Sequence, residues 1–502
     1  MRVPPLAAVL AIALLVRVGV LLIAPGALAA DPDDYRRLAE NIVEHGTFGR
    51  GDAPTAYRPP LYPLLLTGCF AAGDFTRAAI GALHVLLGLA TVAIVFRLAN
   101  RWGLDRRGAI FAALLVACDP ILMFQSARVM TETPATLFAV LGLAALTCVG
   151  KPAAFNGTPR DCGRGENSAA ALPRDRSRGA LLPALLAGAV LGLGALCRPT
   201  TLVWIAAVGV ALLFFDRKNS RRLTASGRVV RCLRLPAAFA LGAAVVLSPW
   251  VIRNQMQFGR PIASTTHGGY TLLLANNPDF YQWLRSGSWG DVWRGDQFNA
   301  LWNERRPRDE LAADRLAYDE AWHAIRSEPG TFVYSCFVRL GRLWSPLPHR
   351  LATEESAARR SSRYAVDVWY MLEYLLAAAG VWRIAKYRNA TSDLLKKSVL
   401  ETSGATAGLP SSVCEKTPEN TAGQASSGTL FQQPARTSAA AQHFAGTWLW
   451  GMLLVLSLSC VHSIYWTDMR MRAVVMPVVA LAAAAGALRR EESRVAKPPS
   501  IV

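Results

Sequence analysis

Long apolar runs, separated by short clusters of charged residues, dominate the chain. A helix needs roughly 17–25 apolar residues to cross a hydrocarbon core, and about ten runs approach or reach that length. They lie at residues 5–23, 78–98, 109–124, 134–149, 181–197, 200–215, 236–252, 366–385, 447–461 and 473–488. The pattern therefore predicts an all-α polytopic membrane protein with about ten transmembrane helices.

The positive charges predict how these helices are oriented. Arginines and lysines gather in alternate connecting loops, near residues 97–107, 174–178, 217–234, 386–397 and 489–490. Cytoplasmic loops carry such an excess, so we expect both termini inside. The opposite side then receives the loop 26–76 and the segment 253–364. Because that segment combines several tryptophans with a helical pattern, we expect it to fold as a mixed extracytoplasmic subdomain.

Two further stretches lack apolar periodicity and are rich in small and polar residues. We predict that both are disordered cytoplasmic insertions. One alternative concerns the first apolar run, because the small residues Ala27-Leu28-Ala29 before Asp31 are also typical of a cleavable signal peptide. Asp31 lies outside in either case. The predicted organisation is an N-terminal transmembrane module 1–252 with insertion 151–180, the subdomain 253–364, and C-terminal helices 365–502 with insertion 389–445.

Composition supports a membrane protein and disfavours a nucleic-acid partner. Of the 502 residues, 52% are hydrophobic and 18% are charged, and the formal net charge is +19. The basic residues sit between apolar runs and not on one soluble face, so we expect membrane lipids, and no nucleic acid, as partners. The nine cysteines form no CxxC pair and indicate neither a disulfide framework nor a zinc site.

Motifs at the outer ends of the runs carry a resemblance to a known family. The first outside loop reads Asp31-x-x-x-Tyr35, then Leu38-Ala39, Gly46 and Tyr57-Arg58-Pro59-Pro60-Leu61-Tyr62-Pro63. Later motifs follow in the expected order: Met130-Thr131-Glu132, Cys197-Arg198-Pro199-Thr200, Ser248 to Asn254, Gly268-Gly269, Asn276-Asn277-Pro278, Glu328-Pro329-Gly330 and Arg470-Met471-Arg472. Their order and sidedness resemble bacterial family 39 glycosyltransferases, which are related to protein O-mannosyltransferases and the lipid A aminoarabinose transferase.

The resemblance implies a fold, a reaction and a place in the cell. The fold is a GT-C-type bundle in the bacterial inner membrane, with its site facing the periplasm or exterior. The reaction moves a sugar from a polyprenyl-phosphate donor to a hydroxyl of a lipid, glycan or protein acceptor, with inversion. The resemblance implies no certain cofactor and leaves a divalent cation open, and we identify no metal ligands.

Such a reaction needs a carboxylate to take the acceptor proton. By its place in the motif, Asp31 is the predicted base, and Asp34 is its competitor because a shift of one residue would exchange their roles. Glu132, at the outer end of a span, is the second predicted catalytic acid. The other interpretations stay open: Asp31 in an exposed acidic cluster with Asp33 and Asp34, and Glu132 in the favourable first turn of a helix.

The donor phosphate needs cationic ligands, and a guanidinium can fork two phosphate oxygens. Arginines at outer span ends and in the first loop are the candidates, although snorkelling at the interface explains each one alone equally well. The predicted phosphate ligands are Arg58, Arg198, Arg253, Arg470 and Arg472. The resemblance adds substrate-binding roles for Tyr35, Tyr57, Tyr62, Asn276 and Asn277.

A polytopic transporter, or a flippase for lipid-linked sugars, is the alternative function. Transporters place charged sites near the bilayer midplane and often show internal repeats. Here the notable charges stand at outer span ends, and the two halves show no repeat. The pattern therefore favours the transferase.

Overall fold

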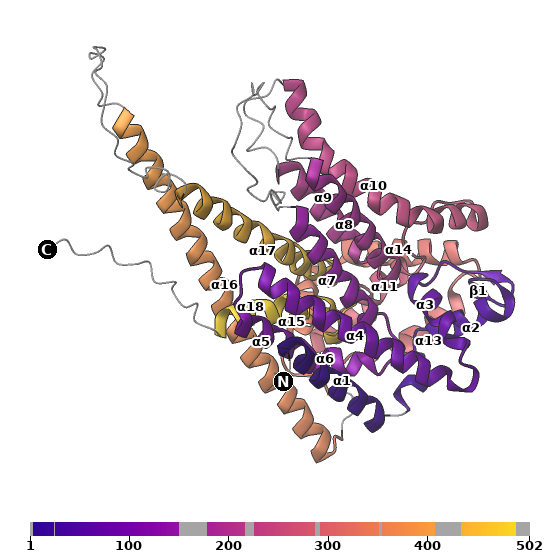
Figure 1. The fold of residues 1–502 in the computed structure, drawn as a ribbon. Coiled ribbons are helices and arrows are strands. Elements are labelled where there is room, and N and C mark those ends of the chain that lie inside the picture. The colour runs from indigo at the N-terminus through magenta and orange to yellow at the C-terminus, as the bar shows by residue number, and fades with distance from the viewer. Residues whose placement is uncertain are drawn as a thin grey trace, which may run out of the picture.

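The computed structural model describes residues 4–24, 26–149, 178–215, 225–286, 292–350, 354–406 and 433–487. They form a bundle of long helices with a group of short elements at one end (Figure 1). This confirms the prediction of an all-α polytopic membrane protein, apart from one two-stranded ribbon. Most of the first predicted insertion, and residues 407–432 of the second, lie outside the described ranges.

The first half of the chain supplies the core of the bundle and the first loop. Its elements are α1 (Pro5–Ile23), η1 (Ala27–Ala29), α2 (Tyr35–His45), β1 (Gly49–Arg50), β2 (Ala53–Pro54), α3 (Leu61–Phe70), η2 (Gly73–Phe75), α4 (Thr76–Arg101), α5 (Arg106–Cys118), α6 (Pro120–Ser126), α7 (Glu132–Val149), α8 (Arg178–Cys197), α9 (Thr201–Phe215) and α10 (Ala225–Phe258). The helices α5 and α6 meet at a bend of 51°. Asp119 stands at this bend and caps α6 by accepting a hydrogen bond from the Leu122 amide at 2.8 Å.

The second half contributes short helices and then three long ones. Its elements are α11 (Gly268–Ala275), α12 (Pro278–Ser286), α13 (Asp296–Arg305), α14 (Glu310–Ser327), α15 (Pro329–Trp344), α16 (Ala357–Thr406), α17 (Gln433–Ile464), η4 (Met469–Val475) and α18 (Met476–Ala487). Thus α16 extends into the predicted second insertion, and α17 begins inside it. The helix α18 is buried along nearly its whole length, so it forms the centre of this half.

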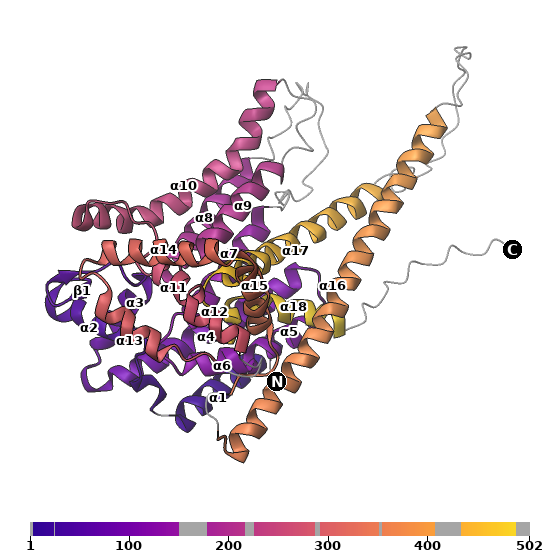
Figure 2. The same cartoon turned by 180° about the vertical axis from the view of Figure 1, so that it is seen from behind.

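The short elements gather at one end of the bundle. Both views place α2, β1, α3, α11, α13 and α14 together there, although they come from two distant stretches of sequence (Figures 1 and 2). The Glu310 carboxylate joins the two stretches, because it accepts hydrogen bonds from the Thr55 hydroxyl at 2.6 Å and the Ala56 amide at 2.9 Å. The loop before α3 and the start of α14 therefore lie side by side.

Glycines allow two helix pairs to pack backbone to backbone. A Cβ atom on Gly188 of α8 would stand 1.9 Å from the Phe239 carbonyl oxygen of α10, and a Cβ on Gly380 of α16 would stand 1.9 Å from the Ala482 carbonyl oxygen of α18. Small residues at helix interfaces are typical of membrane bundles, because they let backbones approach closely. These contacts bind α10 and α16, the two flanking helices, to the core.

Seven described helices are long and apolar enough to span a membrane, or eight if the bent pair α5 and α6 forms one span. Two predicted spans are not among them. The run at 200–215 forms α9, a shorter apolar helix, and the run at 366–385 lies in α16, where Glu373 and Arg383 interrupt the apolar sequence. The coarse prediction of a polytopic membrane protein is confirmed, and the count of ten stays a prediction.

The arginine inside the first apolar run is buried in the bundle. Only 2% of Arg17 is exposed, and its guanidinium donates to the Ala117 carbonyl of α5 at 3.2 Å. A charged side chain is costly in hydrocarbon unless it faces the protein interior. The sequence of α1 therefore suits a helix that packs on the bundle.

Candidate active site

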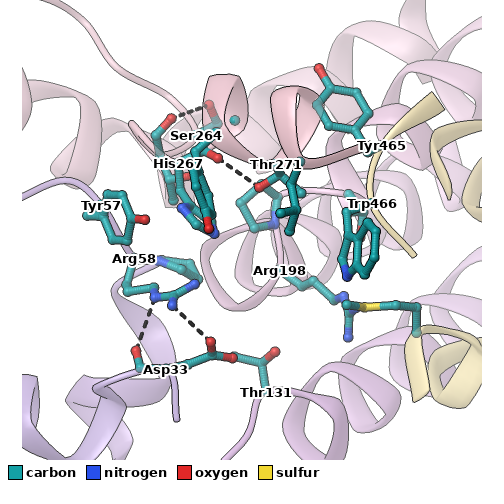
Figure 3. Close-up of a pocket in the computed structure, with 18 of the residues that line it drawn as sticks. Asp33, Tyr57, Arg58, Thr131, Arg198, Ser264, His267, Thr271, Tyr465 and Trp466 are labelled. Carbon is teal, nitrogen blue, oxygen red and sulfur yellow. Dashed lines mark hydrogen bonds and ion pairs between the residues drawn. The ribbon is translucent and has the colours of Figure 1, made fainter. Parts of the chain in front are cut away.

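A cavity of about 660 Å³ opens where the short elements meet the ends of the long helices. Segments that are far apart in sequence line it (Figure 3). They are the loop after α1, the loop before α3, the α6–α7 and α8–α9 links, the stretch from Ser264 to Leu274, part of α13, and the chain from α17 into η4. The ionisable side chains at this cavity are those of Asp33, Tyr35, Tyr57, Arg58, Glu132, Cys197, Arg198, His267, Tyr270, Arg306, Tyr318, His462, Tyr465 and Arg470.

Glu132 and two arginines form a charged cluster on one wall. The Glu132 side chain is 2% exposed, and its Oε1 lies 3.2 Å from an Arg198 nitrogen and 3.9 Å from Nε of Arg470. Its Oε2 is buried and has no hydrogen-bond partner among the described residues. Arg470 is also paired with Asp468, at 3.0 Å. One buried carboxylate thus draws two guanidinium groups from different helix ends into the cavity.

Asp33 and Arg58 form a second charged pair, in the first loop. Arg58 donates to the Asp33 carboxylate at 2.8 Å and to the Asp33 carbonyl at 3.0 Å. Its guanidinium carbon also stands over the rings of Tyr35 and Tyr57, at 5.6 and 5.2 Å from their centroids. Because the Asp33 side chain is 23% exposed and lines the cavity, a substrate can reach its carboxylate.

Aromatic groups close the wall beside Arg58. The rings of Tyr57 and His267 meet edge to face at 4.4 Å between centroids. Burial raises the pKa of Tyr57 to about 12, against the opposing effect of Arg58, so the phenol stays protonated at neutral pH. Burial, and then the charge of Arg58, lower the pKa of His267 well below its usual value. The imidazole is therefore neutral and adds no charge to this wall.

Partly buried polar contacts from α10 and α14 fix the first loop. Arg253 donates to the carbonyls of Phe48 and Thr55, both at 2.9 Å. Glu310 accepts from Thr55, Ala56 and the Thr266 hydroxyl. These contacts hold the backbone on which Arg58 stands, and neither Arg253 nor Glu310 lines the cavity itself.

Asp31 and Asp34, predicted as base and competitor, lie outside the cavity. Asp31 accepts a hydrogen bond from the Arg37 amide at 3.0 Å, at the start of α2, and burial raises its pKa. Asp34 adopts a left-handed conformation with φ of 59° and pairs with Arg50 at 3.0 Å. The turn through Asp34 thus directs Asp33, between them, toward the cavity. The geometry favours Asp33 over the two predicted acids.

Two of the predicted phosphate ligands also lie outside the cavity. Arg253 holds the first loop, as described above. Arg472 is buried and donates to the carbonyls of Leu343 and Ser345, at 3.0 and 2.5 Å. Both arginines thus hold backbone carbonyls away from the cavity, and the geometry does not support them as phosphate ligands. Arg58, Arg198 and Arg470 do line the cavity, as predicted.

The predicted substrate-binding residues divide in the same way. Tyr35 and Tyr57 line the cavity, whereas Tyr62 is buried and hydrogen-bonded to His84 at 2.8 Å. The Asn276 amide donates to the carbonyls of Leu272 and Ile464, at 2.9 and 3.0 Å. The Asn277 side chain accepts from the Phe280 amide at 2.8 Å and so caps α12. The two asparagines therefore join elements of the fold and do not face the cavity.

The sequence analysis missed three residues at or near the site, and only one of them stood in a stretch that the sequence had singled out. Asp33 stands in the acidic cluster of the first loop, but its position relative to the motif favoured its neighbours. His267 and Glu310 stand in no motif that indicates a site. Among the described residues, no three His, Cys, Asp or Glu side chains gather as a metal site.

A family comparison supports the predicted enzyme class. Residues 71–252 match the family model described as dolichyl-phosphate-mannose-protein mannosyltransferase. This match confirms the resemblance to family 39 over that segment. Glu132 and Arg198 stand inside the matched segment, whereas Asp33, Arg58 and Arg470 stand outside it. No curated protein matches the chain.

Several solved structures resemble the fold at low identity. AglB, the Archaeoglobus fulgidus oligosaccharyltransferase, solved with an inhibitory peptide and a dolichol-phosphate, is 13% identical with a TM-score of 0.47, over 96% of this chain and 50% of that one. ArnT from Cupriavidus metallidurans, bound to undecaprenyl phosphate, is 15% identical with a TM-score of 0.34, over 90% and 77%. The S. cerevisiae protein O-mannosyltransferase Pmt1-Pmt2 complex, bound to the sugar donor, is 15% identical with a TM-score of 0.34, over 51% and 35%. The chain spans about half the length of the archaeal enzyme.

Proposed function

We propose that this chain, which carries the mannosyltransferase-family segment at residues 71–252, transfers a sugar from a polyprenyl-phosphate donor to an acceptor hydroxyl. The observation that carries the proposal is the cavity itself. Two carboxylates and four arginines from six separate segments converge on one space of about 660 Å³. A purely structural set of ion pairs gives no reason for such a space between them.

Asp33 is the proposed base. In an inverting displacement, the acceptor oxygen attacks the anomeric carbon as its proton passes to a carboxylate, and the donor phosphate leaves with the electrons of the broken C–O bond. The Asp33 carboxylate is accessible from the cavity, and its partner Arg58 keeps it oriented. The Glu132 carboxylate is less suited to this step, because it is buried against two arginines.

Arg198 and Arg470 are the proposed ligands of the donor phosphate. Charge builds on the leaving oxygen in the transition state, and fixed cationic groups stabilise it without reorganisation. Glu132 then has a positioning role, since it holds both guanidinium groups at the same wall. Arg58 adds a third positive charge near the reacting carbon, and the rings of Tyr35 and Tyr57 fix its plane.

We also propose the finer topology that the charge pattern predicts. The close packing of α16 on α18 through Gly380 supports α16 as a further span, in spite of its charges. With α9 as another, the count reaches ten, and the cluster of short helices lies on the extracytoplasmic side. The arrangement is then a GT-C-type bundle in a bacterial inner membrane, with a lipid, glycan or protein as acceptor.

The experiment is donor turnover by the full chain in lipid nanodiscs, with a panel of polyprenyl-phosphate monosaccharides and a membrane extract as acceptor source. We expect the chain to release polyprenyl phosphate from one donor. Asp33→Asn should still bind that donor but turn it over about 10²–10⁴-fold more slowly. Asp34→Asn is the matched control, and its rate should change by less than about twofold because its pair is exposed.

Two results would contradict these proposals separately. Unchanged turnover in Asp33→Asn would remove Asp33 as the base and leave the transferase activity in place. Failure of the unmodified chain to turn over any donor in the panel would reject the proposed function.

A further inference from the structure

A second cavity, also of about 660 Å³, lies where α15 ends and α16 begins. None of its lining residues lines the candidate active site. Four of them are arginines and one is a glutamate. We call it the basic cavity. The arginine, glutamate and histidine side chains that line it are those of Arg342, His349, Arg350, Glu355, Arg360 and Arg363.

The single carboxylate of the basic cavity is already occupied. Glu355 accepts two hydrogen bonds from Nε of Arg363, at 2.7 and 3.0 Å, and Arg363 also donates to the Pro348 carbonyl at 2.7 Å. Arg350 and Arg360 are exposed and make no ion pair within the described ranges. Two guanidinium groups at the cavity therefore have no anionic partner in the described chain.

The pKa of His349 is affected by the positive charge of the surrounding arginines. Burial, and then the charges of Arg342 and Arg363, lower the pKa of its imidazole. Its Nε2 is buried and has no hydrogen-bond partner in the described part of the chain. A neutral imidazole with a vacant nitrogen, set among arginines, suits an anion that brings its own proton or accepts a hydrogen bond.

Exposed apolar stripes on both helices lead to this cavity. On α15, Val333 and Phe337 are 53% and 66% exposed, and the next residue at the same spacing is Gly341, which lines the cavity. On α16, Tyr364 lines the cavity and begins a stripe that continues one and two turns later. The exposed members of that second stripe are Tyr364, Val368, Met371, Leu372 and Leu375. Residues at this spacing share one face of a helix.

We propose that the basic cavity binds the anionic phosphate headgroup of a membrane lipid, with the acyl chains along the two stripes. A guanidinium forks phosphate oxygens, which fits the unpaired Arg350 and Arg360. Basic pockets between membrane helices are suited to such headgroups. A soluble phosphate would use the arginines but not the apolar stripes, so the stripes favour a lipid. This site goes beyond the proposed transferase reaction and does not depend on it.

The basic cavity touches the same segment as the active site. Ser345 lines it, and the Ser345 carbonyl accepts a hydrogen bond from Arg472, two residues from Arg470 in η4. A lipid bound in the basic cavity would therefore contact the segment that holds η4, from which Arg470 reaches the candidate active site.

The test is a lipid titration of the detergent-purified full chain, followed by native mass spectrometry. Phosphatidylglycerol and phosphatidylcholine with the same acyl chains are the two probes. We expect phosphatidylglycerol to bind more tightly, and the double variant Arg350→Glu/Arg360→Glu to weaken its binding about tenfold or more. Arg359→Glu is the matched control for the single variant Arg360→Glu, because it makes the same charge change in the same helical turn but does not line the cavity.

Three outcomes would overturn the proposal. They are equal binding of the two lipids, equal loss in Arg359→Glu and Arg360→Glu, and displacement of phosphatidylglycerol by glycerol phosphate at the same concentrations. The last result would assign the cavity to a soluble phosphate. Arg470→Gln should leave this binding unchanged, which separates the site from the donor cavity and from any failure of the transferase proposal.

Discussion

Two sets of arginines in this molecule look alike in the sequence and differ in what they contact. The cavity arginines, Arg58, Arg198 and Arg470, pair with carboxylates at the wall of the cavity. The scaffold arginines are Arg253, Arg339 and Arg472, and each donates to at least two backbone carbonyls. The scaffold arginines hold backbone carbonyls and do not line the cavity, whereas an arginine paired with a carboxylate at the cavity is placed to meet the phosphate of the proposed reaction. The partner, more than the motif, separates the two roles.

The largest effect should come from a cavity arginine. Arg470→Gln removes a positive charge where the leaving phosphate gathers charge, so we expect kcat/KM for the donor to fall about 10²–10³-fold. Because its side chain is partly exposed and faces open space, thermal stability should change little. Turnover and Tm in the same nanodiscs check both halves of this expectation. Near-normal turnover would place Arg470 with the scaffold.

A matched substitution of a scaffold arginine, Arg472→Gln, should lower stability and leave turnover nearly unchanged. Arg472→Gln leaves the buried carbonyls of Leu343 and Ser345 without their donor, and a buried unsatisfied polar group costs about 1–3 kcal/mol. We expect a lower Tm and less folded protein, but turnover per folded molecule within about threefold of normal. A selective loss of turnover at normal Tm would show that the two sets are not distinct.

The smallest effect concerns the acid that the sequence motif favoured. Asp31→Asn keeps an oxygen that can accept the Arg37 amide hydrogen bond and removes only a charge outside the cavity. We expect turnover within about twofold of normal and a change in stability of less than about 1 kcal/mol. A loss as large as that expected for Asp33→Asn would restore Asp31 as the base and move the site.

The sequence was sufficient to find the segments of the site but not the residues within them. The prolines after Arg58, the acid at the start of α7 and the basic link at Arg198 predicted convergence on one face, and those segments do meet there. The choice between Asp31 and Asp33 depends on the left-handed turn at Asp34, which pattern and charge do not specify. Arg470 and Arg472 were equivalent in the motif. They lie in a 3₁₀ segment with about three residues per turn, so they point to different faces.

The same limit applies to the membrane helices. Strongly apolar runs such as those of α1, α4 and α7 were predicted with nearly the right bounds, because hydropathy alone defines them. The run in α16 is harder to assign, since Glu373 and Arg383 interrupt it, and the Arg383 guanidinium is held by the Ala485 and Gly486 carbonyls of α18. Tertiary contacts of this kind leave no periodic signal.

Glu310 gives the site a mechanical property. Its carboxylate ties Thr55, Ala56 and Thr266 to the first turn of α14, so α14 and the Arg58 loop are fastened at one point. A displacement of α14 must therefore either pull on the backbone two residues before Arg58 or break those bonds together. The position of the Arg58 loop is thus coupled to that of α14.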